Sequence, residues 1–300
     1  MWKRIGSIRL ESWGDPRLHS HMAVPVIEPL DFPNCRLYFS SRDVRNQSRT
    51  FAAEFDITNL EHGVTSEPLL VLDLGELGTF DDSGAMASWL TTCGDDRYLY
   101  YQGWNLSVSV PFRNSIGLAI SRGGKPFEKS GPGPLLDRMY GEPHFVATPA
   151  VLETAGAWRM WYLSCTSWEN GPDGPVHRYH IKSAVSLDGI QWERPGKIAI
   201  DYRDESEYAI SRPSVLIDDS LWRMWFSYRG HRYRIGYAES SDGETWIRKD
   251  SPMGLAPSGR GLETEMVEYP YVFRLGQALY MAYNGDNYGK AGVLFAVWQD

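Results

Sequence analysis

The chain has 300 residues and a formal net charge of −8, with 42% hydrophobic residues and three cysteines. This composition supports a large buried core, and the lack of a basic cluster argues against nucleic acid as a partner. Three cysteines are too few for a disulfide framework, and no apolar run is long enough to span a membrane. We therefore predict a cytoplasmic protein with reduced thiols and no membrane contact.

One pattern of strands and turns recurs five times along the chain. Four copies begin with an apolar strand that contains a proline, namely Pro25, Pro149, Pro213 and Pro270. The second copy has residues 84–87 at this place. A strand rich in aromatic residues follows in each copy, at 36–40, 97–101, 158–162, 222–226 and 278–283. Such a repeat of short strands is typical of a β-propeller, in which each copy forms one blade.

The later part of each copy predicts two more strands. Asp188-Gly189 and Asp242-Gly243 have the composition of tight hairpin turns, in which glycine supplies a positive φ. The last segment, 293–297, matches the third strand at 235–239, whereas 2–6 resembles the fourth strand at 192–196.

Together these patterns predict an all-β fold with a single domain over residues 1–300. The expected architecture is a five-bladed β-propeller with four antiparallel strands per blade. The N-terminal strand would complete the last blade and close the ring, which would leave no strand edge exposed.

Polar residues beside the predicted first strands are the candidates for a functional site, because these strands surround the central channel of a propeller. In chain order they are His19, His21, Asp81, Asp82, Glu142, His144, Ser211, Arg212, Glu263, Glu265 and Glu268. Every predicted blade supplies at least one of them.

Two segments resemble a known superfamily. Residues 211–246 and 268–284 are similar to the five-bladed β-propeller glycoside hydrolases, which include arabinanase/xylosidase, invertase/levansucrase and mannoside phosphorylase families. Glu268, directly before Tyr269-Pro270, looks like the general acid in the Glu-Gly-Pro segment of arabinanase-like enzymes. The resemblance implies Glu268 as the acid and Asp81 or Asp82 as the second carboxylate, whose distance from the acid decides between inversion and retention.

Histidines stand where the resemblance leads us to expect acidic residues. His21 and His144 occupy these places in the first and third copies, and we include both among the catalytic candidates. His19 and His21 are two residues apart, as are Glu142 and His144, so each pair would share one face of a strand. These four residues could hold a divalent transition metal such as Zn, Mn or Fe. Alternatively, the histidines hydrogen-bond substrate hydroxyls or support the loops.

Further residues are predicted to bind the substrate. An unpaired guanidinium in the interior is unfavourable. We therefore expect Arg212 to bind a carboxylate or phosphate of the substrate or, alternatively, to pair with Glu268 or Asp82. The ends of the second strands supply other candidates for contacts with sugar hydroxyls: Arg42, Trp104, Arg229, Asn284 and Asp286. Trp104 or Trp168 would be the stacking platform for a sugar ring.

These residues lead to three hypotheses about function. The first is a carbohydrate-active, glycosidase-like enzyme that uses carboxylate acid/base catalysis in the central funnel. Its substrate, and hence the predicted partner, would be a small glycoside, a sugar phosphate or an activated sugar. The second is a metal-dependent enzyme that uses a His/carboxylate site in the same funnel. The third is a sugar-binding propeller without catalysis.

Overall fold

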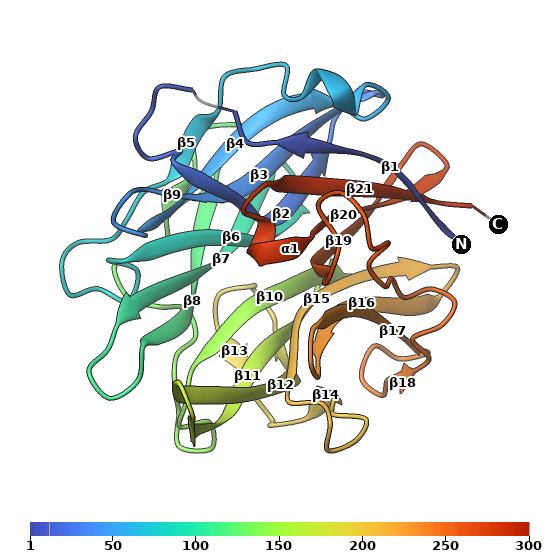
Figure 1. The fold of residues 1–300 in the computed structure, drawn as a ribbon. Coiled ribbons are helices and arrows are strands. Elements are labelled where there is room, and N and C mark those ends of the chain that lie inside the picture. Colours follow the sequence, from blue (N-terminus) through green and yellow to red (C-terminus); the bar gives the residue numbers. More distant parts are fainter. Residues whose placement is uncertain (12, 300) are drawn as a thin grey trace.

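The computed structural model describes residues 1–11 and 13–299 and consists almost entirely of β-strands (Figure 1). The described residues contain two short helical segments, η1 (Leu60–His62) and α1 (Asp286–Gly289). The prediction of an all-β fold is therefore confirmed. No helix in this part of the chain is long and apolar enough to cross a membrane.

The strands form antiparallel meanders of four strands that follow one another along the chain. The first contains β2 (Ser20–Pro29), β3 (Asn34–Arg42), β4 (Ser48–Asp56) and β5 (Leu69–Leu72). The second contains β6 (Gly84–Cys93), β7 (Asp96–Leu106), β8 (Phe112–Ser121) and β9 (Glu128–Lys129). The third contains β10 (Val146–Thr154), β11 (Ala157–Gly171), β12 (Gly174–Ser186) and β13 (Trp192–Glu193), and β12 also pairs with β14 (Ile198–Ile200). The fourth contains β15 (Ala209–Asp218), β16 (Leu221–Arg229), β17 (Tyr233–Ser240) and β18 (Ile247–Arg248).

A fifth meander joins the two ends of the chain. It contains β19 (Glu268–Leu275), β20 (Ala278–Asn284), β21 (Gly292–Trp298) and the N-terminal strand β1 (Trp2–Arg9). Strand β1 is antiparallel to β21, with Trp2 opposite Trp298, and Figure 1 shows the two termini close together. The indole N–H of Trp2 donates to the carbonyl of Met253 over 2.7 Å, and the ring packs edge-on against Trp225. The first strand in sequence is therefore an integral part of the last meander.

The Trp2 hydrogen bond gives a test of this end pairing. We expect Trp2→Phe to lower the free energy of unfolding by about 1 kcal/mol, because the phenyl ring keeps the apolar packing while the indole donor to Met253 is lost. The exposed neighbour Lys3 provides the control, since Lys3→Ala should change stability by less than about 0.5 kcal/mol. Urea unfolding would measure both changes. Equal values for the two variants would contradict a stabilising role of this contact.

The first strands of the five meanders surround the centre of the molecule. Strand β2 contacts β6, β6 contacts β10, β10 contacts β15, β15 contacts β19, and β19 contacts β2. Figure 1 shows these strands grouped in the middle. The register of each first strand shifts directly after a matching residue: Ala23, Ala87, Ala147, Ser211 and Glu268. The register of β2 also shifts a second time, just before Ala23. Such bulges bend a strand and re-aim its side chains.

The bulges explain the repeated prolines of the sequence. In four of the first strands the residue directly before the proline has a left-handed backbone: Val24 (φ 54°), Thr148 (40°), Arg212 (51°) and Tyr269 (54°). A non-glycine residue in this region costs about 1–3 kcal/mol and is often found at functional sites. Two of the sequence candidates, Arg212 and Glu268, thus lie at the distorted point of their strands.

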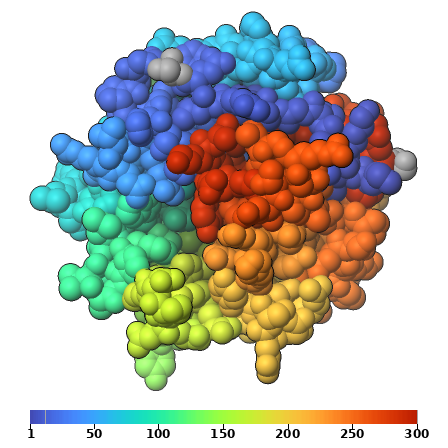
Figure 2. Space-filling model, viewed as in Figure 1, coloured from blue at the N-terminus to red at the C-terminus, as the bar shows by residue number. Residues whose placement is uncertain are grey.

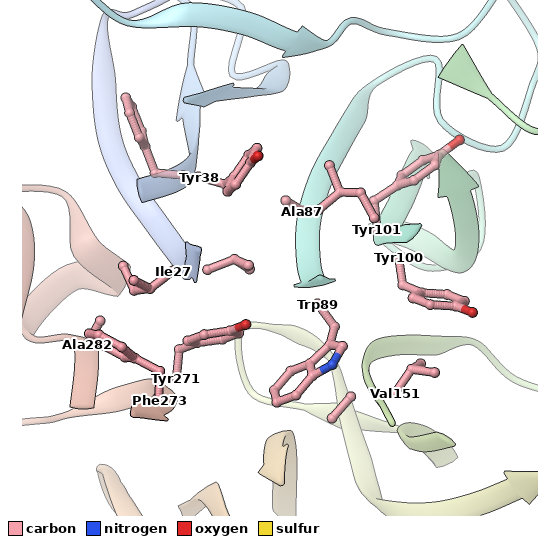
Figure 3. Close-up of a cluster of buried hydrophobic side chains, with 14 of the residues drawn as sticks. Ile27, Tyr38, Ala87, Trp89, Tyr100, Tyr101, Val151, Tyr271, Phe273 and Ala282 are labelled. Carbon is pink, nitrogen blue, oxygen red and sulfur yellow. The ribbon is translucent and has the colours of Figure 1, made fainter. Parts of the chain in front are cut away.

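Aromatic side chains fill the space between successive meanders, as their abundance in the sequence predicts. Trp161 and Trp225 are fully buried, and the ring of Trp161 lies 5.6 Å from that of Trp222 in the next meander. Figure 3 shows Trp89 of β6 and Tyr271 of β19 close together, with ring centroids 4.9 Å apart. These contacts join the meanders into a continuous core.

The Asp-Gly turns between third and fourth strands form as predicted. The carboxylate of Asp188 accepts two N–H groups from the residues that follow it, at 2.8 and 2.7 Å, and Asp242 does the same at 2.8 and 2.8 Å. Gly189 and Gly243 both have a φ of 73°, which a side chain would oppose. Both aspartates therefore serve the turns.

Candidate functional site

Carboxylates that precede the first strands are held in a repeated arrangement. In three meanders a buried acid accepts a hydrogen bond from a tyrosine 20 residues later: Asp81 from Tyr101 (3.0 Å), Glu142 from Tyr162 (2.9 Å) and Glu263 from Tyr283 (3.2 Å). These carboxylates belong to residues that are at most 4% exposed. In these three meanders the second strand thus contacts the segment before the first strand.

A basic residue completes each arrangement. The ion pairs are Lys129 with Asp81 (2.6 Å), Lys182 and Arg194 with Glu142 (3.3 and 3.1 Å), Arg4 with Glu263, and Arg248 with Glu207 (2.6 Å) in the fourth meander. Phe226 stands in the second strand of that meander, and Arg248 lies over its ring at 5.1 Å. We refer to Asp81, Glu142, Glu207 and Glu263 as the carboxylate ties, because they fasten the loops to the meanders.

The two aspartates implied as partners of Glu268 lie elsewhere. Asp81 is one of the carboxylate ties and faces the outer strand β9. The side chain of Asp82 accepts the N–H of Gly78 at 3.0 Å and the hydroxyl of Ser83 at 2.8 Å, so it closes a turn. The charge that shifts the pKa of Glu268 is that of Arg229. Neither aspartate contributes to this shift.

The residues predicted to bind a metal do not come together either. Glu142 is engaged as a carboxylate tie, and His19 is exposed. His21 has a φ of 72°, so the backbone is not extended there and His19 and His21 do not share a strand face. His144 is half-buried in the segment before β10. Among residues 1–11 and 13–299, no group of three or more His, Cys, Asp or Glu side chains is placed to hold a metal ion.

Glu268 differs from the carboxylate ties in having no partner. It begins β19, it is fully buried, and neither of its carboxylate oxygens accepts a hydrogen bond from the described residues. Burial raises the pKa of Glu268 well above its ordinary value, and the positive charge of Arg229 opposes this shift without cancelling it. The site therefore favours the protonated acid, which is the form that can donate a proton.

Tyrosines from several meanders surround Glu268. Tyr179 of β12 and Tyr233 of β17 share a hydrogen bond between their hydroxyls, and the ring of Tyr288 lies 6.3 Å from that of Tyr233. Burial, with a further contribution from Glu268, raises the pKa of Tyr233 and of Tyr288. The Arg229 guanidinium lies over the Tyr233 ring at 5.3 Å. Three tyrosines with raised pKa values, together with the cation Arg229, therefore interact electrostatically with Glu268.

Further positive charges act on His21 and on Tyr269. Burial, together with the charges of Arg42 and Lys290, lowers the pKa of His21 to about 4, so His21 is neutral at pH 7. Arg42 also acts on Tyr269, which follows Glu268 directly. These positive charges, of Arg42 and Lys290 on His21 and of Arg229 on Glu268, suit a negatively charged ligand.

A cluster of aromatic rings contacts Tyr179 through His177. His177 stacks on Tyr179 with centroids 5.1 Å apart and lies 4.9 Å from the half-buried Trp168. Phe112 and Phe145 contact both His177 and Trp168. Trp168 and His177 face each other across the β11–β12 hairpin. Of the two tryptophans suggested as a stacking platform, Trp168 is therefore the one near Glu268.

Three of the other predicted sugar contacts are engaged within the protein. The Trp104 indole donates to Ser48 Oγ over 2.7 Å. The side chain of Asn284 is fully buried and bonds to the backbone of Met22, Val24 and Gly292. Asp286 accepts N–H groups from residues 264, 265 and 266 at 2.7–3.0 Å. These side chains hold loops in place. The charge of Arg229 acts on Glu268, and that of Arg42 acts on the next residue, Tyr269.

The sequence analysis missed Tyr179, Tyr233, Tyr288 and Lys290. They do not occupy equivalent places in the repeat: Tyr179 lies within β12, Tyr233 begins β17, and Tyr288 and Lys290 lie between β20 and β21. The carboxylate ties, in contrast, carry a signal that the sequence displays: an acid and a tyrosine 20 residues apart, repeated in three copies.

Two hollows on the surface lie away from Glu268. One is lined by residues 71–76 together with Asp81, Phe127 and Lys129, and the other by residues between Leu10 and His19 together with Val44. The first adjoins a carboxylate tie at the periphery. Neither hollow includes the acid.

Comparison with known proteins supports the description of the fold. No protein-family profile matches the chain. The uncharacterized protein Rv1502 of Mycobacterium tuberculosis is 37% identical over 301 residues, which cover 100% of this chain and 99% of that protein. The solved structure of a glycoside hydrolase matches with a TM-score of 0.74 at 14% identity and covers 99% of this chain and 91% of its own. An α-L-arabinofuranosidase from Lactobacillus brevis matches with a TM-score of 0.70 at 12% identity, over 94% of this chain and 93% of its own.

At identities of 14% and 12%, these two solved structures are evidence for the fold alone. They are glycoside hydrolases of the five-bladed β-propeller type, the group that the sequence resembles.

Proposed function

We propose that this chain, which belongs to the same family as the Mycobacterium tuberculosis protein Rv1502, is a carbohydrate-active enzyme with its site at the centre of a closed five-bladed propeller. The contacts of the first strands from β2 round to β19 and back to β2 support the ring, as does the pairing of β1 with β21. The glycoside hydrolases that share this fold support the substrate class. In this proposal residues 1–300 form one domain.

The observation that carries the proposal is the environment of Glu268. A general acid must hold its proton at the working pH and release it to the leaving oxygen, and burial raises the pKa of this carboxyl accordingly. The absence of a hydrogen-bond partner among the described residues leaves the acid available to a substrate. A purely structural carboxylate in this fold, such as Glu142, is instead fully paired.

The nucleophile in this proposal is an anion. Hydrolysis needs a second carboxylate as base or nucleophile, and the described residues place none beside Glu268. The oxygen of a phosphate or carboxylate is already ionised, so it needs no base, and Arg42 and Lys290 would bind it. The proton of Glu268 goes to the glycosidic oxygen, the bond from that oxygen to the anomeric carbon breaks, and an oxygen of the anion bonds to that carbon. The reverse step consumes a sugar phosphate.

A sugar reaches Glu268 in this proposal when Tyr288 moves. Tyr288 is 38% exposed and belongs to α1, which lies near the centre of the face shown in Figures 1 and 2. Asn287 and Tyr288 both have positive φ, 58° and 60°. A short segment held in this unfavourable region is a natural element to rearrange on binding.

A ligand panel tests the substrate class. We expect sugar 1-phosphates to raise the unfolding temperature more than the matching neutral sugars do, because the positive charges of Arg42 and Lys290 act on His21 and that of Arg229 acts on Glu268. In the double variant Arg42→Gln and Lys290→Gln, affinity for the phosphate-bearing ligand should fall by at least about tenfold, the value of one charged hydrogen bond. Isothermal titration would give the dissociation constants.

The matched control is Arg45→Gln, which removes an exposed arginine three residues after Arg42. This variant should bind like the wild type. Equal affinity of the wild type for charged and neutral sugars would contradict an anionic ligand. If Arg45→Gln lost as much affinity as the double variant, the effect would come from the net charge of the protein and not from Arg42 and Lys290.

A sugar-binding protein without turnover is the second candidate. It is favoured by the complete burial of Glu268 and by the engagement of Asp81 and Glu142 in carboxylate ties. Ligand binding that is retained in Glu268→Gln, together with the absence of turnover in the wild type, would support this candidate over the enzyme.

A further inference from the structure

The centre of the molecule contains a buried guanidinium that no carboxylate neutralises. Arg212 stands at the bulge of β15 and is fully buried, and its Nη2 donates to the carbonyl of Pro25 over 2.8 Å. Pro25 belongs to β2, whereas the first strands beside β15 are β10 and β19. The side chain therefore reaches across the space that the first strands enclose.

The predicted ion pair of Arg212 with Glu268 or Asp82 does not form. Its charge is influenced by two tyrosines, Tyr271 and Tyr269, and by no acid among the described residues. The guanidinium carbon lies 5.7 Å from the centre of the Tyr271 ring. Burial lowers the pKa of Arg212 to about 10, so the group remains charged at neutral pH.

Two donors of this guanidinium are unused. The Nε and Nη1 atoms of Arg212 have no hydrogen-bond partner in the part of the chain that the structure describes. A buried charge without a countercharge is strongly unfavourable, and buried donors left unpaired add to that cost. The structure therefore demands a negative charge that can accept hydrogen bonds at Arg212.

The neighbouring side chains supply further donors. Trp89 packs against the same Tyr271 ring, with centroids 4.9 Å apart (Figure 3), and its buried indole N–H also has no partner among the described residues. The hydroxyl oxygen of Thr148 is occupied by the backbone N–H of Arg212 at 3.3 Å. The Tyr271 ring thus contacts two side chains, Arg212 and Trp89, whose buried N–H groups have no partner among the described residues.

We propose that the centre of the fold holds a small monovalent anion of chloride size, which accepts hydrogen bonds from Nε and Nη1 of Arg212. Such an anion supplies the missing charge and satisfies both donors. A divalent ion such as sulfate would lose more hydration energy on complete burial and is disfavoured. The charge that acts on Glu268 is that of Arg229, and the anion proposed at Arg212 does not depend on the proposed active site.

Bromide tests the proposal directly, because it replaces chloride and scatters anomalously. In crystals of the full-length protein prepared in sodium bromide, we expect an anomalous peak at hydrogen-bonding distance from Nε or Nη1 of Arg212. In solution at constant ionic strength, replacing gluconate by chloride should raise the unfolding temperature of the wild type with the logarithm of chloride concentration.

Variants assign the solution effect to this side chain. The chloride dependence should vanish in Arg212→Met and persist in Arg45→Met, which removes an exposed arginine. If Arg212→Met fails to fold, the bromide peak in the wild type still decides the matter. Bromide peaks at surface arginines only, meaning an adventitious ion only, would overturn the proposal. So would a chloride response that survives in Arg212→Met, or stabilisation through Arg212 by sugar phosphates but not by chloride.

Discussion

Replacing Glu142 with glutamine is expected to lower the free energy of unfolding by about 3–5 kcal/mol, the usual effect of breaking a buried ion pair. The carboxylate accepts hydrogen bonds from Tyr162 and Ser164 at 2.9 and 2.7 Å and pairs with Lys182 and Arg194. Glutamine would leave the two cations, whose side chains are 14% and 10% exposed, without a counterion. Urea unfolding at pH 7 measures the difference.

The effect should depend on pH in a defined direction. Burial alone would raise the pKa of Glu142, but its hydrogen bonds and the charge of Lys182 outweigh burial and lower it. A lowered pKa in the folded state contributes stability above the ordinary value of about 4.5, and this contribution is lost as the pH falls through the folded pKa. The wild type and Glu142→Gln should therefore converge in stability in acid.

An exposed ion pair on the same hairpin provides the control. Glu169 pairs with Arg178 at 2.7 Å, and both side chains are more than a third exposed. Glu169→Gln should therefore change stability by about 0–1 kcal/mol. If Glu142→Gln lowered the free energy of unfolding no more than Glu169→Gln does, the carboxylate ties would not hold the loops to the meanders.

The repeats of the sequence were sufficient to predict the strands and their order. Trp158 and Trp222 open equivalent strands, and the alternation of apolar and polar residues after them has the period of a strand. The N-terminal strand was found in the same way, because residues 2–6 match a fourth strand that the last copy lacks. Local pattern was enough here, since each meander is a local structure with short turns.

The roles of the acidic residues could not be read in the same way. Asp81, Glu142 and Glu268 all precede or begin a first strand, so position in the repeat does not separate them. What separates them is the partner: a tyrosine 20 residues later for Asp81 and Glu142, and none for Glu268. The spacing alone does not show this, because Tyr288 stands 20 residues after Glu268 and Ser227 stands 20 residues after Glu207. Only the structure shows that no described residue donates a hydrogen bond to the Glu268 carboxylate.

The surroundings of Glu268 were beyond sequence analysis for a geometric reason. Tyr179, Arg229 and Tyr288 come from three different meanders: Tyr179 lies within β12, Arg229 ends β16 and Tyr288 belongs to α1. Side chains there are aimed by bulges and by left-handed residues such as Tyr269, which a strand pattern does not reveal. The metal-site hypothesis failed for the same reason, since it assumed an extended backbone at His21.

Replacing Glu268 with glutamine should have the opposite effect on stability and remove turnover. The folded pKa of Glu268 is raised, so its ionisation in the unfolded chain opposes folding as the pH rises above the ordinary value of about 4.5. The wild type should lose up to about 1.4 kcal/mol of stability per pH unit from that point towards the folded pKa. Glutamine has no such ionisation, so Glu268→Gln should be more stable than the wild type at pH 7.

Turnover of the substrate found in the ligand panel should fall by at least about 100-fold in Glu268→Gln, because the amide cannot donate the proton. Unfolding curves from pH 4 to pH 8, beside the rate at each pH, measure both effects on the same preparations. A destabilisation like that of Glu142→Gln would show that the Glu268 carboxylate is a structural partner after all. If Glu268→Gln gains stability and loses rate, Glu268 serves catalysis at the expense of folding stability. A residue that serves the fold would instead stabilise it.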